Sequence, residues 1–161
     1  MNATEIIAID PGASGGIAIL RPEEDDTPEL RPMPKADTEL RDLLADFAAA
    51  RTNSRAPVRV VLERVPGFVA GMATPASALA KLHRQFGYIQ GLCDAFRLPL
   101  RLVTPQQWQK AVGAGSKREH GDRWKAHLRD LAARLYPGVK GLTLKTADAL
   151  LILHAATGAA K

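Results

Sequence analysis

Residues 5–20 read EIIAIDPGASGGIAIL, two apolar runs separated by a turn that holds Pro11, Gly12 and Ser14. The first run, Glu5–Asp10, ends in an acid, and the second covers Gly15–Leu20. Short apolar runs bounded by Pro, Gly and Ser are typical of β-strands. This opening therefore predicts two strands joined by a short turn, with a carboxylate at the end of the first strand.

The rest of the chain alternates between helical and strand patterns. Pro and acidic residues in 21–34 indicate a loop or a weak edge strand, and two glycines with a proline make 65–73 a candidate mobile loop. Thr74-Pro75 and Thr104-Pro105 are helix start signals, the second with Gln107 placed for a capping box. We expect strands over 58–63 and 101–103, and helices over 37–51, about 75–96, 105–113, about 119–136 and about 144–157. This order predicts an α/β fold, a mixed central sheet of about five strands flanked by helices.

Composition limits the class of protein. A length of 161 residues favours one domain over 1–161, large enough to bury a core. Cys93 is the single cysteine, which excludes an internal disulfide and a cysteine zinc site. Residues 1–20 lack the basic start of a signal peptide, and no apolar run reaches the roughly 18 residues that span a bilayer. We therefore expect a cytoplasmic protein with no membrane partner.

Charge is distributed unevenly along the chain. Residues 101–145 hold ten Lys and Arg against three Asp and Glu, whereas 21–50 hold four against nine. A basic half attracts polyanions, and nucleic acid is the first candidate. A solvated helix surface that is basic without a partner is the alternative.

Three carboxylates stand next to apolar segments. Asp10 follows Ile6–Ile9, Glu63 follows Val58–Leu62, and Asp148 lies in the apolar helix expected near the end of the chain. An ionised carboxylate is costly in such places unless it is paired. Together the three would form a site of hard oxygen ligands for Mg²⁺ or Mn²⁺, and two such ions support phosphodiester hydrolysis. Taken singly, each acid is also explained as a helix cap or a surface ion pair.

Several motifs resemble those of RuvC-type Holliday-junction resolvases, which have the RNase H-like fold. The resemblance covers most of the chain outside 21–57. Actin-like ATPases and pre-ribosomal-RNA nucleases share the outline of the opening hairpin, so all the motifs in this order are more specific than any one motif. These motifs are Ile7–Gly12 with Gly15–Ala18, Val60–Glu63, Ser77–Leu82 with Gly87 and Gly91, Thr104–Gly115, and Ala147–Leu151.

The resemblance implies a role for each acid. Asp10 would bridge two metal ions, Glu63 would bind one and position the attacking water, and Asp148 would complete the site. Members of the family usually carry a fourth acid or a histidine one turn before the last Asp, where this chain has Lys145. Lysine cannot ligate a metal while charged, so it would contact the scissile phosphate, or the second metal would bind weakly. His154 and Asp122 are spare candidates for the missing ligand.

DNA contacts are expected in two places. The resemblance implies that Phe68, in the loop after Glu63, wedges into the junction centre by stacking on a base. The alternative is that Phe68 folds back onto the core, as we expect for Trp108 and Trp124. Basic residues around the Gly113–Ser116 turn are candidates for phosphate contacts, and a solvated face is again the alternative. These residues are Lys110, Lys117, Arg118, Arg123 and Lys125, of which Lys117 and Lys125 are the first choices.

The helix expected at 75–96 suggests self-association. Its apolar residues recur at spacings of three and four, which is a heptad seam. Small residues on another face leave room for core on one side and a partner on the other. We expect a homodimer, which would present two active sites to two strands. The seam consists of Leu79, Leu82, Phe86, Ile89 and Cys93, followed by Phe96.

The sequence thus predicts a crossover junction endodeoxyribonuclease, a homodimer that hydrolyses four-way DNA junctions with Mg²⁺ or Mn²⁺, two ions per site. Three alternatives remain open. One is another nuclease of this fold that acts on structured RNA or other branched DNA. Another is a catalytically weak junction-binding protein, suggested by Lys145. An actin-like ATPase fragment is the third, although 161 residues leave no room for its second domain.

Overall fold

The computed structural model describes residues 4–22, 25–53, 57–67 and 74–158. Its strands form one five-stranded sheet in the order β3-β2-β1-β4-β5. Strands β1 and β2 and strands β2 and β3 pair antiparallel, whereas β4 runs parallel to both β1 and β5. The mixed sheet predicted from the sequence is confirmed. Its strands are β1 (Glu5–Asp10), β2 (Gly16–Arg21), β3 (Asp25–Pro32), β4 (Val58–Glu63) and β5 (Leu100–Val103).

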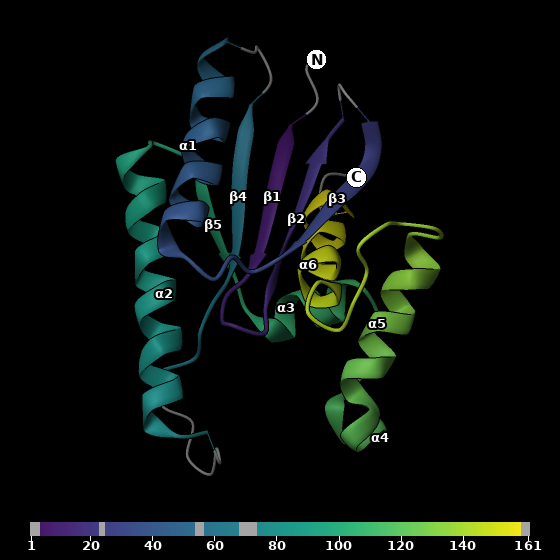
Figure 1. Cartoon of the computed structure of the whole chain (residues 1–161). Helices are drawn as coiled ribbons and strands as arrows, with labels where there is room; N and C mark the ends of the chain where they lie inside the picture. Colours follow the sequence, from purple (N-terminus) through teal and green to yellow (C-terminus); the bar gives the residue numbers. More distant parts are fainter. Residues whose placement is uncertain (1–3, 23–24, 54–56, 68–73, 159–161) are drawn as a thin grey trace.

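Helices cover both faces of this sheet (Figure 1). Helices α1 (Asp37–Asn53) and α2 (Ala76–Ala95) pack on one face. The other face carries α3 (Pro105–Ala111), α5 (Trp124–Leu135) and α6 (Ala147–Gly158). Between α3 and α5 lie the short α4 (Lys117–His120) and the 3-10 turn η1 (Gly121–Arg123), at the end of the molecule away from the termini. None of the described helices is long and apolar enough to cross a membrane.

Side chains alternate between the two faces of the sheet along β1 and β4, and this decides which face Asp10 and Glu63, at the ends of these strands, lie on. Ile7 and Ile9 face α1 and α2, whereas Ile6 and Ala8 face α6. In β4, Val60 and Leu62 belong to the α1 and α2 side and Val61 to the α6 side. Successive strand residues point to opposite faces, so the acids that end both strands belong to the α6 side.

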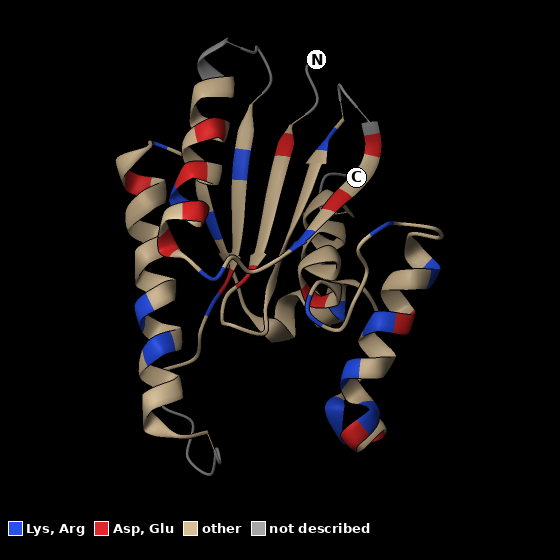
Figure 2. Ribbon diagram, in the orientation of Figure 1, with Lys and Arg blue, Asp and Glu red and all other residues tan. Residues whose placement is uncertain are grey.

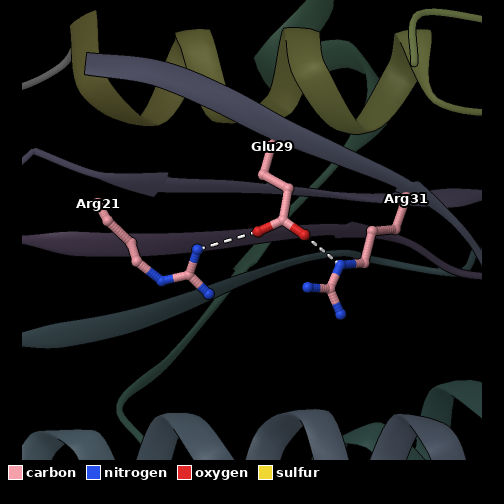
Figure 3. Close-up of polar contacts among 3 residues, drawn as sticks. All are labelled: Arg21, Glu29 and Arg31. Carbon is pink, nitrogen blue, oxygen red and sulfur yellow. Dashed lines mark hydrogen bonds and ion pairs between the residues drawn. The ribbon is translucent and has the colours of Figure 1, made fainter. Parts of the chain in front are cut away.

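Of the two alternatives for 21–34, a loop or a weak edge strand, the structure has the edge strand: β3 lies at the edge of the sheet and extends over eight residues. Figure 3 shows one reason, the carboxylate of Glu29 between two arginines. Arg21 Nη1 on β2 donates to Glu29 Oε2 at 3.0 Å, and Arg31 donates to the other oxygen. Burial alone would raise the pKa of Glu29, but the two guanidinium groups lower it. The ionised Glu29 therefore ties the edge strand to its neighbour, in spite of the unfavourable Pro and Asp content.

Two expected helices differ from the structure. The helix expected at 119–136 is broken, because Gly121 has a φ of +54°, which ends α4 before η1 and α5. The last helix begins at Ala147 instead of about Leu144. Before it, Thr146 donates its hydroxyl to the Gly141 carbonyl and accepts the Thr143 N–H, which holds 141–146 as a turn.

The turn before α6 lies against the start of β2. A Cβ atom at Gly16 would lie 2.7 Å from the Lys145 carbonyl oxygen and 3.1 Å from the Thr146 Cα. Both neighbours are backbone atoms, which cannot rotate away. We expect Gly16→Ala to lower the free energy of unfolding by about 1–3 kcal/mol, as overpacking does.

Urea denaturation measures this effect, and Gly87→Ala in α2 is the matched control. A Cβ at Gly87 meets nothing within 4 Å, so that substitution should stabilise the helix by up to about 1 kcal/mol. Equal stability of the Gly16→Ala and Gly87→Ala variants would contradict the close approach of β2 and the turn.

Candidate active site

Two of the three acids lie side by side at the ends of parallel strands. Ile9 on β1 is in register with Leu62 on β4, so Asp10 and Glu63 follow at the same level of the sheet. Carboxyl ends of parallel strands are where α/β folds place their sites, since the chain leaves the sheet there. The sheet thus fixes the backbones of both acids relative to one another.

Helix α6 supplies the third acid. Asp148 lies in the first turn of this helix, which packs across β1 and β2. Asp148 is only 6% exposed, and its Oδ1 atom receives no hydrogen bond from the described part of the chain. A helix N-terminus favours a negative charge, but a buried carboxylate oxygen without a donor still calls for a cation or a polar ligand.

Lys125, at the start of α5, is the cation that contacts these acids. Its Nζ forms an ion pair with Asp148 Oδ2. The sequence assigned Lys125 to phosphate binding and Lys145 to the active site, but Lys145 is exposed in the turn before α6. The charges that act on Asp10 and Glu63 include Lys125 and not Lys145. Lys125 is therefore the lysine that the structure brings to the acids, and the contact of Lys145 with the scissile phosphate stays a prediction.

Trp108 is a site residue that the sequence suggested only as core. Its ring is 1% exposed, and its indole Nε1 donates to Glu63 Oε2 at 2.5 Å. A capping box between Thr104 and Gln107 fixes the start of α3 and thereby places Trp108 one turn later. The capping signal predicted the helix, but nothing in the sequence indicated which residue the indole would meet.

Mutual repulsion and burial shape the electrostatics of the site. Burial, followed by the charges of Glu63 and Asp148, raises the pKa of Asp10 to about 8. Burial and Asp148 also raise the pKa of Glu63, against the effect of the Trp108 hydrogen bond. Burial alone would lower the pKa of Lys125, but its ion pair and the neighbouring carboxylates raise it. The three acids are thus close enough to oppose one another's ionisation, and one lysine offsets them incompletely.

The donor set fits a divalent metal ion in its chemistry. Carboxylate oxygens are the ligands that Mg²⁺ and Mn²⁺ prefer, and a bound cation would remove the repulsion that raises these pKa values. Within the described residues, no three His, Cys, Asp or Glu side chains already stand close enough together to hold an ion. The side chains of Asp10, Glu63 and Asp148 would have to turn toward the ion, and the ion pair of Lys125 with Asp148 would loosen.

Of the predicted DNA-contact residues, the structure describes the basic ones but not Phe68. Phe68 falls outside the described residues. Lys110 lies in the last turn of α3, and the others are exposed along α4, η1 and the start of α5, where basic residues gather in Figure 2. We call α4, η1 and the start of α5 the basic arm. Its phosphate-binding role stays a prediction for Lys117, Arg118 and Arg123, and for Lys110 at its edge.

The predicted dimer seam is partly wrong. Ile89 and Cys93 are 0% and 1% exposed within one protomer, where they pack against the sheet. A heptad seam and the buried side of a surface helix share the same spacing, so the sequence could not separate them. Leu79, Leu82 and Phe86 are half-buried toward the other end of α2, and their role as an interface stays a prediction.

Comparison with solved structures identifies the architecture. RuvC from T. thermophilus in complex with a Holliday junction substrate matches with a TM-score of 0.60 and 15% identity, over 98% of this chain and 94% of that one. A second T. thermophilus RuvC structure matches with a TM-score of 0.54 and 16% identity, over 98% and 95% of the chains. The yeast mitochondrial Holliday junction resolvase matches with a TM-score of 0.50 and 14% identity, over 98% of this chain and 79% of that one.

These likenesses show that the chain has the RNase H-like fold of RuvC, as the sequence motifs predicted. No protein-family profile and no curated protein matches the sequence. The fold is therefore shared at low sequence identity.

The repulsion among the acids predicts that the site is unfavourable for folding when no metal is present. In the unfolded chain Asp10 ionises with its ordinary pKa, whereas the folded site disfavours its charge. Ionisation of Asp10 thus opposes folding at neutral pH. We expect Asp10→Asn to raise the free energy of unfolding in EDTA at pH 7 by roughly 1–3 kcal/mol.

Chemical denaturation checks this expectation, with Asp46→Asn on the exposed side of α1 as the control that removes the same charge. Mn²⁺ should raise the melting temperature of the wild type and not that of Asp10→Asn. A loss of stability in Asp10→Asn would mean that the acid is satisfied within the site.

Proposed function

We propose that this protein is a metal-dependent DNA endonuclease that resolves four-way junctions. The observation that carries the proposal is the convergence of Asp10, Glu63 and Asp148 from β1, β4 and α6 around Lys125. The structural neighbours support the choice of substrate, because one is a complex with a Holliday junction and another is a junction resolvase. The basic arm beside the acids offers a surface for DNA.

Each residue of the site has a separate role in the proposed phosphodiester hydrolysis. Asp10, Glu63 and Asp148 would hold one or two Mg²⁺ or Mn²⁺ ions, which when bound activate water and stabilise the leaving oxygen. Trp108 holds one oxygen of Glu63 and leaves the other for a ligand or water. Lys125, once released from Asp148, brings a positive charge to the phosphate undergoing cleavage.

Symmetric cleavage of a junction requires two sites, so the proposal includes a homodimer. The half-buried Leu79, Leu82 and Phe86 of α2 offer apolar surface for a second copy, while Ile89 and Cys93 anchor the helix to its own sheet. A two-fold arrangement would present two acidic sites to two strands.

A second candidate function is a junction-binding protein with weak or no cleavage. It is favoured by the ion pair between Lys125 and Asp148, which engages one of the three acids, and by Lys145 in place of a further acidic ligand. Both functions bind branched DNA, but only the first nicks it when metal is added.

Substitution of Glu63 separates the two functions. Glu63→Gln keeps the size of the side chain and can still accept from Trp108, but it removes the charge needed for a metal. We expect cleavage of a labelled four-way junction in Mg²⁺ or Mn²⁺ to fall at least about 100-fold, with junction binding in EDTA retained.

The control for this experiment is Asp46→Asn, which removes an exposed acid and should cleave normally. Cleavage at the wild-type rate by Glu63→Gln would exclude Glu63 from the active site. Absence of nicking by the wild type in either metal would favour the second function.

Binding to different DNA shapes tests the substrate. In EDTA the protein should bind a four-way junction more tightly than a linear duplex of the same sequence. Replacing Lys117 and Arg118 of the basic arm by Ala should weaken binding to all sequences and lower the slope of log affinity against log salt by about one unit per lost contact.

Fluorescence anisotropy over a salt series measures both quantities. Equal affinity for junction and duplex would redirect the proposal to another substrate of an RNase H-like nuclease. An unchanged salt slope would remove the basic arm from the DNA interface.

A further inference from the structure

A hollow of about 770 Å³ opens on the side of Asp10 that faces α2. Its walls are the turn 10–15 between β1 and β2, residues 33–35 before α1, and the first half of α2. A volume of this size holds a ligand much larger than a metal ion. Lys125, at the start of α5, also lines it, so the hollow extends from the acids and this lysine to α2.

The hollow is fixed relative to the acids by a hydrogen bond. Gly12 lies two residues after Asp10, and its N–H donates to Gln85 Oε1 on α2 at 2.6 Å. Gly12 has a φ of +111°, and a Cβ there would lie 3.2 Å from Leu82 Cδ1, so turn and helix are in close contact. A ligand in the hollow would therefore lie at a set distance from Asp10.

The charged side chains of this hollow are mainly basic. Lys35 and Lys81 are exposed and have no ion-pair partner among the described residues. Arg84 is engaged by Asp37, with Nη1 and Oδ2 2.7 Å apart. Two unpaired ammonium groups beside an acidic site favour an anion with several charges.

A second hollow of about 520 Å³ adjoins the first and shares Ala13, Met33, Pro34 and Lys35 with it. Its lining also includes Lys145, from the turn before α6. Lys81, Lys35 and Lys145 thus follow one another along two connected hollows, with apolar surface between them. A DNA backbone, in which charged phosphates alternate with sugars, matches this alternation of lysines and apolar surface.

We propose that these hollows bind the sugar-phosphate backbone of the DNA strand that leaves the cleavage point, opposite the basic arm. This inference rests on the proposed nuclease function and deepens it by naming where the strand runs. Lys35 and Lys81 contact phosphates. Figure 2 shows Lys and Arg on both sides of the sheet end, on the lower half of α2 and on α4 and α5. DNA would then cross the acids from one basic surface to the other.

The double variant Lys35→Ala, Lys81→Ala tests the groove. Binding of a fluorescein-labelled four-way junction is measured in EDTA over a salt series. We expect affinity at low salt to fall about tenfold and the salt slope to fall by about two units, one for each phosphate contact. Neither lysine has a structural partner in the described chain, so the melting temperature should not change.

The matched control is Arg101→Ala, Lys140→Ala, which removes two exposed positive charges outside both hollows. A groove variant that binds like this control overturns the inference. If the Lys117 and Arg118 variant still loses affinity in that case, the nuclease proposal stands without the groove. Failure of the wild type to bind DNA would overturn both.

A variant with the opposite sign completes the test. Asp37→Asn removes the one acid that engages Arg84 in the groove, and it keeps a polar side chain at the start of α1. We expect the freed guanidinium to strengthen junction binding a few-fold and to steepen the salt slope by about one unit. A purely structural role for this pair would give lower stability and no gain in affinity, which would count against the groove.

Discussion

Three carboxylates at one edge of a sheet, one buried and two half-buried, are the constraint on which the rest of this structure depends. Strands β1 and β4 end at the same level, and α6 brings Asp148 to them. Burial and repulsion raise the pKa of Asp10 to about 8, so this arrangement opposes folding unless a cation balances it. Lys125 supplies part of that balance through Asp148. A stable protein tolerates such a site when the rest of its core is well packed, and both faces of this sheet are covered by apolar helices.

The two faces of the sheet serve the site differently. The α6 side holds the acids, Trp108 and Lys125, so it determines the local charge and the orientation of Glu63. On the other side, α2 is bound to the turn after Asp10 through Gln85, and the hollow there is lined by Lys35 and Lys81, which have no ion-pair partner among the described residues. The hollow on the α2 side is also lined by Asp10 and Lys125, so it opens directly onto the acids.

Much of this arrangement was predictable because it depends on local patterns. Apolar runs ending in Asp10 and Glu63 identified β1 and β4, and the Thr-Pro signals identified the starts of α2 and α3 within two residues. Pro and Asp in 21–34 left both a loop and a weak edge strand open, and the structure has an eight-residue edge strand there, in which Glu29 pairs with Arg21 and Arg31. Helix periodicity failed at α2, since the spacing of Ile89 and Cys93 does not say whether a sheet or a partner covers them.

By itself, the sequence determined the strands, most of the helices, and the three acids, since hydrophobic period and capping act over a few neighbouring residues. Only the tertiary structure decided which lysine meets the acids. Lys145 is three residues from Asp148 in the chain, but the turn held by Thr146 leaves it exposed, on the lining of the second hollow. Lys125, 23 residues away, reaches Asp148 because α5 packs on α6. Coulombic pairing depends on distance in space, and helix packing between distant segments sets that distance.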